Sequence, residues 1–169
     1  MSAEPTGRIE SGDRLVLRRT LRAPVEEVWA AVADSGRLAR WYGAWSGDPG
    51  TGRVEVVMTA EGRAEPETVL VRRCEPPRHL ALTLGEAAGA WRIDVDLEEA
   101  DGTTTLSLTH RHPAPGVLDS VGPGWEYYLD RLVAAEGGGD PDAVDFERDY
   151  HPAMAGHYRA LGEQLRPGR

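Results

Sequence analysis

The chain has 169 residues, of which 40% are hydrophobic, and this composition suits one domain with an enclosed core. Its 19 basic and 28 acidic residues give a net charge of -9, which opposes binding to phosphate backbones and to anionic membrane surfaces. The single cysteine, Cys74, excludes an internal disulfide, and a lone thiol of this kind is predicted to be a small buried residue. With no basic and apolar leader and no apolar run of about 18 residues, the sequence favours a cytoplasmic protein without membrane insertion or a nucleic-acid partner.

The N-terminal part predicts a strand followed by two short helices. Residues 1–12 are expected to form a flexible leader, and the alternating segment 18–22 is expected to be a strand. Pro24 suits the first turn of a helix, because its missing N–H donor is not needed there. One face of that helix carries Val25, Val28, Trp29 and Val32. A second, shorter helix is predicted before Gly43, with Leu38, Trp41 and Tyr42 on one side.

The middle of the chain predicts a series of strands separated by glycine, proline or acidic turn residues. These segments are 54–58, 68–74, 79–84, 91–98 and 103–112. Together with the first strand they make six. The turn at Ala100, Asp101 and Gly102 is typical of a tight hairpin, and such short connections indicate an antiparallel sheet.

Two of these strands show which side of the sheet is buried. In the first, Trp91, Ile93, Val95 and Leu97 alternate with Arg92, Asp94, Asp96 and Glu98, so the apolar row is expected to face the core and the charged row to face water. In its hairpin partner, the buried row is predicted to contain Leu106, Leu108, His110 and His112.

A closing helix is predicted to cover this sheet. It is expected to start after Pro123, to end at 137–139, and to present a wide apolar stripe. The stripe consists of Trp125, Tyr128, Leu129, Leu132 and Val133. The segment 139–169 predicts a further helical extension, interrupted at Pro152 and packed on the surface of the same domain outside the main core.

Five motifs in this order resemble the START-like or SRPBCC helix-grip superfamily, and within it the branch similar to the C-terminal domain of the heat-shock-protein ATPase activator homologue. They are APVEEVWAAVAD, LARWYG, CEPPRHL, TTLSLTH and GWEYYLDRL. The resemblance implies an α+β fold in which a curved six-stranded antiparallel sheet wraps around a long C-terminal helix and encloses an apolar pocket. The domain would span 13–138, with 139–169 as an extension beyond the usual end of the family. Besides packing on its own domain, this extension could cover the pocket mouth or build a dimer interface.

Members of this superfamily bind lipids, hormones or polyketides on one scaffold, and some are enzymes or chaperone partners. Our first hypothesis is therefore the binding of a small hydrophobic or aromatic molecule between the sheet and the closing helix, without evident catalysis. The residues predicted to line this cavity are Trp41, Trp45, Met58, Trp91, His110, Trp125, Tyr128 and Leu129. The alternative for each of them is that it fills the core.

Two other functions stay open. A polyketide cyclase or aromatase-like enzyme would use His110 as its acid or base, oriented by Tyr128 or Asp96. A protein-interaction domain resembling the chaperone ATPase activators, or a homodimer built through the extension, is the second alternative. His110 and His112 could share a metal ion, but a third ligand is missing from the sequence, so neither a metal nor another cofactor is predicted.

Overall fold

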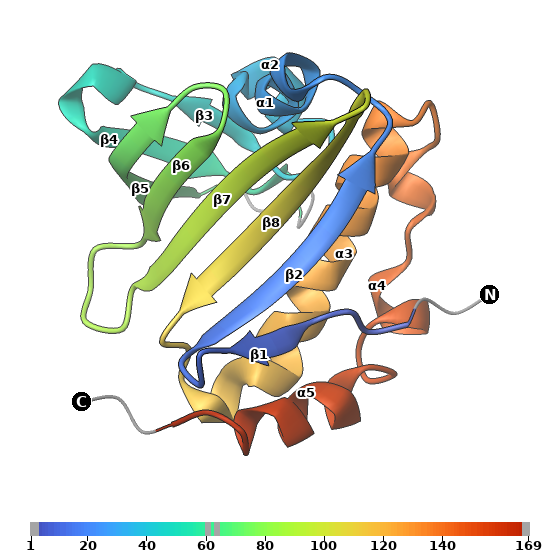
Figure 1. The fold of residues 1–169 in the computed structure, drawn as a ribbon. Coiled ribbons are helices and arrows are strands. Elements are labelled where there is room, and N and C mark those ends of the chain that lie inside the picture. The colour runs from blue at the N-terminus through green and yellow to red at the C-terminus, as the bar shows by residue number, and fades with distance from the viewer. Residues whose placement is uncertain (1–3, 60–61, 63–64, 167–169) are drawn as a thin grey trace.

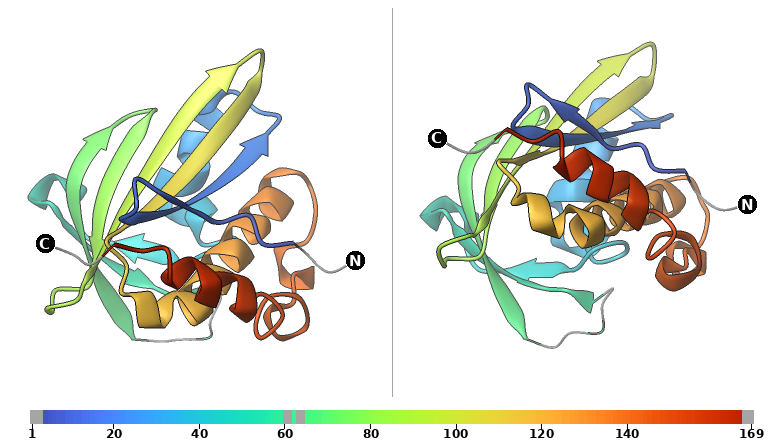
Figure 2. Two further views of the ribbon diagram at one scale, coloured as in Figure 1. Left: turned by 60° about the horizontal axis from the view of Figure 1, so that its bottom comes forward. Right: turned by 90° about the horizontal axis from the view of Figure 1, so that it is seen from below.

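The computed structural model of the protein describes residues 4–59, 62 and 65–166. Within these residues, eight strands form one antiparallel sheet in the order β1-β2-β8-β7-β6-β5-β4-β3. Figure 1 shows that the sheet curves around the long helix α3 (Leu118–Glu136), and the view from below in Figure 2 shows α3 inside the curve. The predicted α+β class and the antiparallel sheet packed on a long C-terminal helix are confirmed.

The sheet has two strands more than the six that the sequence predicted. The strands are β1 (Arg8–Glu10), β2 (Arg14–Leu21), β3 (Ala44–Ser46), β4 (Arg53–Val57), β5 (Pro66–Glu75), β6 (His79–Leu84), β7 (Trp91–Ala100) and β8 (Thr103–Arg111). The two additional strands are β1 and β3, which are three residues long and lie at the two edges. Three residues are too few to show an alternating pattern, and β1 lies within the segment predicted to be a flexible leader.

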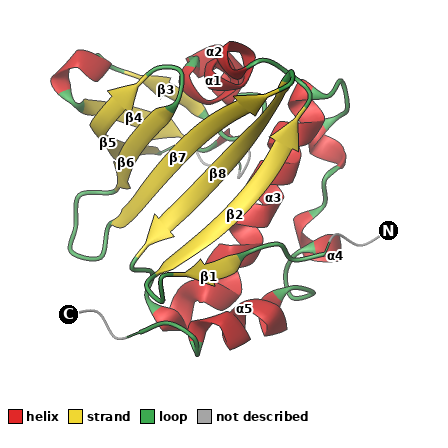
Figure 3. Cartoon of the chain, viewed as in Figure 1, coloured by secondary structure: helices red, strands yellow, loops and turns green. Residues whose placement is uncertain are grey.

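The helices lie between the strands and after them, as Figure 3 shows by colour. They are α1 (Val25–Ala33), α2 (Ser35–Leu38), α3, α4 (Phe146–Asp149) and α5 (Ala155–Gly162), with single 3-10 turns η1 (Pro49–Thr51), η3 (Pro115–Val117) and η4 (Pro141–Ala143). The side chain of Asp34 caps α2 by accepting a hydrogen bond from the backbone N–H of Arg37 at 3.0 Å. In the described part of the chain, no helix is both long and apolar enough to cross a membrane.

The start of α3 differs from the prediction. The helix begins at Leu118, so Pro123 lies inside it and does not precede it. A proline in a helix interior removes one backbone hydrogen bond, which is why the sequence pattern favoured a later start. The earlier start adds about one and a half turns to the helix, and these turns place Val121 on the face that meets the sheet.

The inner face of the sheet follows the predicted register. Leu15 of β2, His110 of β8 and Ile93 of β7 lie opposite one another in one row, and all three are almost completely buried. His110 therefore does continue the apolar row. His112 lies beyond the end of β8, with a φ of 49° and an exposed side chain, so the row ends before it.

Asp94 and Cys74 differ from their predicted environments. Asp94 lies on the outer face of the sheet but is only 4% exposed, because Arg111 and Arg72 cover its carboxylate. The guanidinium Nε of Arg111 donates to Asp94 Oδ2 at 2.7 Å, which explains how a charge can be buried on a face that was expected to be wet. Cys74, expected to be buried, is exposed on β5.

The C-terminal extension packs against the domain and reaches into its core. Tyr158 of α5 is fully buried, and Tyr150, Met154 and Leu161 belong to the same hydrophobic core, so the predicted packing outside the core is wrong. Helix α5 lies across α3 in both views of Figure 2. Gly122 makes the contact possible, since a Cβ atom at that position would lie 2.1 Å from the Tyr158 ring.

Candidate functional site

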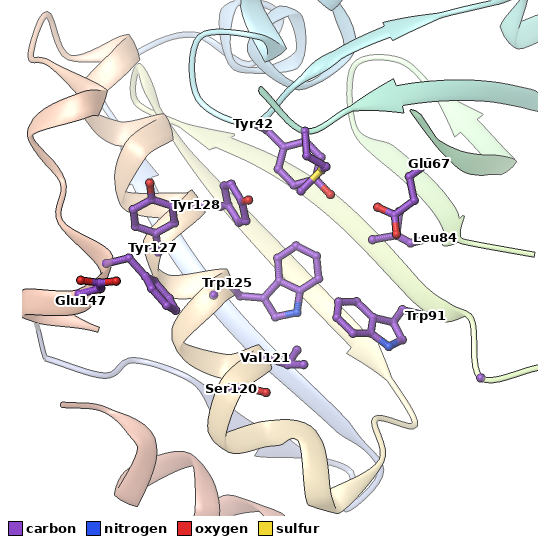
Figure 4. A pocket seen from close by; sticks show the side chains of 14 residues that line it. Tyr42, Glu67, Leu84, Trp91, Ser120, Val121, Trp125, Tyr127, Tyr128 and Glu147 are labelled. Carbon is purple, nitrogen blue, oxygen red and sulfur yellow. The ribbon is translucent and has the colours of Figure 1, made fainter. Parts of the chain in front are cut away.

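A cavity of about 740 Å³ lies between the inner face of the sheet and α3. Six of its fourteen described lining residues are aromatic: Tyr42, Trp91, Trp125, Tyr127, Tyr128 and Phe146. Figure 4 labels the first five of them. The remaining wall consists of Met58, Leu84, Val121, Gly89 and Gly124, with the polar residues Glu67, Ser120 and Glu147. Pockets of about 300–1,000 Å³ with a mainly apolar lining are typical sites for small organic molecules.

Helix α3 supplies one wall of the cavity through residues on a single face. Val121, Trp125 and Tyr128 are four and three positions apart, which places them one above the other along the helix. Tyr128 also meets the ring of Tyr42, which follows α2, in an edge contact with ring centroids 4.8 Å apart. The segment that follows α2 and helix α3 therefore meet at this wall.

The opposite wall contains an aromatic side chain that the fold leaves uncovered. Trp91 is the first residue of β7 and is paired with Leu84 of β6 on the inner face. Trp91 is nevertheless 38% exposed. It is one of two large hydrophobic residues in the described chain that are exposed. The ring centroids of Trp91 and Trp125 are 6.1 Å apart, so the two indoles flank the same space.

His110 lies behind these two indoles and is not part of the cavity wall. It is 1% exposed, its ring is 5.2 Å from that of Trp91, and the indole N–H of Trp125 donates to its Nδ1 at 3.2 Å. Burial lowers the pKa of His110 from 6.5 to about 4, so the imidazole is neutral at neutral pH and carries its proton on Nε2. Of the two predicted orienting partners, Asp96 pairs with His79 on the outer face at 2.6 Å, and Tyr128 lines the cavity, while Trp125 engages Nδ1 of His110.

The eight predicted cavity residues divide into two groups. Met58, Trp91, Trp125 and Tyr128 line the cavity, whereas Trp41, Trp45, His110 and Leu129 do not. The two tryptophans of the second group serve the packing of α1, since Trp41 Nε1 donates to the carbonyl of Ala31 and Trp45 Nε1 to the carbonyl of Ala33, each at 2.9 Å. Leu129 is 1% exposed and lies in the core.

Several lining residues were not predicted from the sequence. Val121 and Ser120 were missed because the helix was expected to start after Pro123, although Val121 has the helical spacing to Trp125 that would identify it. Phe146 and Glu147 come from α4 in the C-terminal extension, and nothing in the local pattern of a four-residue helix indicates that it reaches the cavity.

A second buried group, also unpredicted, joins both ends of the chain to α3. Glu126 of α3 is fully buried, and it accepts hydrogen bonds from the Tyr158 hydroxyl at 2.8 Å, from Arg19 at 2.9 Å, and from the backbone N–H and hydroxyl of Thr6 at 2.5 Å each. Burial and the neighbouring Glu126 raise the pKa of Tyr158, so its hydroxyl stays a donor. Four donors around one carboxylate satisfy a buried charge and leave it no role as a free base.

The described residues contain no group of three or more histidine, cysteine, aspartate or glutamate side chains placed to hold a metal ion. His110 and His112 are the pair that the sequence singled out. The first is hydrogen-bonded in the core, and the second is exposed beyond the strand. They therefore do not converge on one point.

Comparisons with known proteins agree with this fold. The family model described as Activator of Hsp90 ATPase homolog 1-like protein matches residues 22–136, more than half of the chain. The solution structure of CalU16 from Micromonospora echinospora has a TM-score of 0.72 and 25% identity over 98% of each chain. Its crystal structure has a TM-score of 0.69 and 26% identity over 95% of this chain and 96% of CalU16.

Two further solved structures show the same architecture. The protein encoded by gene BPP1335 from Bordetella parapertussis has a TM-score of 0.69 and 29% identity over 98% of this chain and 94% of its own. The Aha1 dimer from Colwellia psychrerythraea has a TM-score of 0.60 and 16% identity over 73% of this chain and 95% of its own, a likeness of fold alone. Among curated proteins, no match was found.

Proposed function

Since the chain belongs to the family described as Activator of Hsp90 ATPase homolog 1-like protein, we propose that it uses the cavity of this SRPBCC-type domain to bind a small hydrophobic or aromatic molecule. The observation that carries the proposal is the exposure of Trp91, which is 38% although the side chain lies on the inner face of the sheet. Covering apolar surface on the order of 100 Å² stabilises a complex by about 2.5 kcal/mol, so a ligand placed against this ring gains binding free energy there.

The proposal is for binding without catalysis. His110 contacts both indoles, but it is buried behind them, neutral, and engaged through Nδ1 with Trp125. A general acid or base must reach the proton that it transfers and have a pKa near the working pH. His110 meets neither condition, and the cyclase alternative therefore receives no support from this geometry.

Native mass spectrometry of the purified protein, followed by organic extraction, tests the proposal. We expect a co-purified small molecule, or binding of an aromatic compound from a panel, seen as quenching of tryptophan fluorescence. Trp91→Ala should weaken that binding about tenfold or more, because it removes the exposed ring. Trp45→Phe is the matched control, since Trp45 does not line the cavity and its replacement should leave the affinity unchanged. A protein that is empty and ignores the whole panel would refute the proposal.

A further inference from the structure

Glu67 places a carboxylate at an inward-facing position of the sheet. Along β5, side chains alternate between the two faces, so Glu67 points to the same side as Val69. Its neighbour across the strand pair is Val56, and both valines are buried in the core. A charged side chain thus stands in a row that is otherwise apolar. Figure 4 shows its carboxylate on the side of the cavity formed by Leu84 and Trp91.

The carboxylate of Glu67 has no hydrogen bond or ion pair with another described residue, whereas acidic residues elsewhere on this part of the sheet are paired. Glu55, Glu75 and Glu86 each contact an arginine: Arg53 in the case of Glu55 and Glu86, and Arg73 in the case of Glu75. Those contacts lie on exposed surfaces, where pairing contributes little. Glu67 is likewise exposed to solvent, but it also lines the cavity, so the occupant of the cavity can supply a partner for its charge.

The rest of the wall also favours a positive charge. None of the described lining residues is basic, and six of them present aromatic rings, whose faces attract cations. Glu147 adds a second carboxylate, from α4, on the side of the cavity opposite to Glu67 in Figure 4. Among the described lining residues, an anionic ligand such as a fatty acid would meet two negative charges and no compensating cation.

We propose that the ligand is an arylalkyl amine that carries a positive charge at neutral pH, with its ammonium group paired to Glu67 and its ring placed against the adjoining indoles of Trp91 and Trp125. This inference rests on the proposed function, because it names the chemical class of the molecule that the cavity binds. The carboxylate and the ammonium form a charge-assisted hydrogen bond, and the indoles supply apolar contact and cation–π attraction.

Three probes with one ring system separate the contribution of charge from that of the apolar body. They are 2-naphthylmethylamine, which is cationic at pH 7, 2-naphthylmethanol, which is neutral, and 2-naphthoate, which is anionic. Because Glu67 is exposed and solvent weakens the ion pair, we expect the amine to bind about two- to fivefold more tightly than the alcohol, and the naphthoate to bind most weakly. The preference for the amine should decrease in high salt.

Glu67→Gln should abolish the preference for the amine while leaving the affinity for the alcohol unchanged. Glu75→Gln is the control, because it removes an equal charge from an exposed position of the same strand outside the cavity lining, and it should leave the preference unchanged. Equal affinities of the amine and the alcohol, or an unchanged preference in Glu67→Gln, would overturn this inference and leave the proposed function standing. Failure of all three probes to bind would count against the proposed function itself.

Discussion

His110 should cause the protein to lose stability as the pH falls from 7 to 5. Burial holds the pKa of its imidazole at about 4 in the folded protein, whereas the unfolded chain titrates near 6.5. Between these values the unfolded state binds more protons, so the stabilisation is fully present above pH 6.5 and is lost as the pH falls toward 4. The shift corresponds to about 3 kcal/mol in total, of which about 2 kcal/mol is lost between pH 7 and pH 5.

Urea unfolding of the wild type and of His110→Asn at pH 7, 6 and 5 measures this contribution. Asparagine does not titrate, and it keeps an oxygen acceptor near the position of Nδ1 for the indole N–H of Trp125. Because carboxylates titrate equally in both proteins, the difference between them isolates the histidine. The wild type should lose about 2 kcal/mol more than the variant between pH 7 and pH 5.

A third variant, His110→Leu, checks the role of the hydrogen bond. It leaves the buried indole N–H of Trp125 without an acceptor, which should cost about 1–3 kcal/mol at pH 7 relative to His110→Asn.

In the pH series, parallel loss of stability in the wild type and in His110→Asn would refute the assignment of a depressed pKa to this histidine.

Three further predictions concern packing. Gly122→Ala should destabilise the protein by about 1–3 kcal/mol in urea unfolding, because its methyl group would meet the Tyr158 ring, whereas Gly124→Ala, with nothing within 4 Å, should cost no stability. Tyr158→Phe should cost about 1.5–3 kcal/mol by the same measurement, since it removes a donor from a buried carboxylate. Trp125→Ala should cost about 3–5 kcal/mol, and Trp91→Ala clearly less, because the second ring is already exposed; equal losses would contradict this.

The repeating parts of the fold could be predicted from the sequence because their periodicity is long enough to be seen. The β7–β8 hairpin is the best case: the predicted turn joins Ala100 to Thr103, and the apolar rows fall on one face over the length of both strands. By contrast, β1 and β3 are too short to alternate. Their pairing depends on neighbouring strands that lie far away in the sequence.

The site was harder to predict because it depends on which neighbours cover each residue. Alternation placed Asp94 and Trp91 on the correct faces of β7, yet Asp94 is buried by arginines and Trp91 is exposed in a cavity. Both outcomes result from contacts with other strands, which one strand's pattern cannot contain. Trp41 and Trp45 show the same limit, since their indole N–H groups reach carbonyls of α1 and not a ligand.

The C-terminal extension lies beyond the family match but contributes part of the cavity wall. The family match ends at residue 136, the last residue of α3, yet Phe146 and Glu147 of α4 line the cavity from beyond that point. Tyr150 donates to Asp130 at 2.6 Å, Tyr158 donates to Glu126, and Arg131 of α3 donates to the carbonyl of Pro141 at 2.8 Å, so hydrogen bonds with α3 hold the extension against the domain. CalU16 aligns with almost the whole chain, whereas the Aha1 structure covers 73% of it. We therefore expect proteins of this fold that lack the extension to enclose a differently shaped cavity, because one aromatic and one acidic part of this wall would be missing.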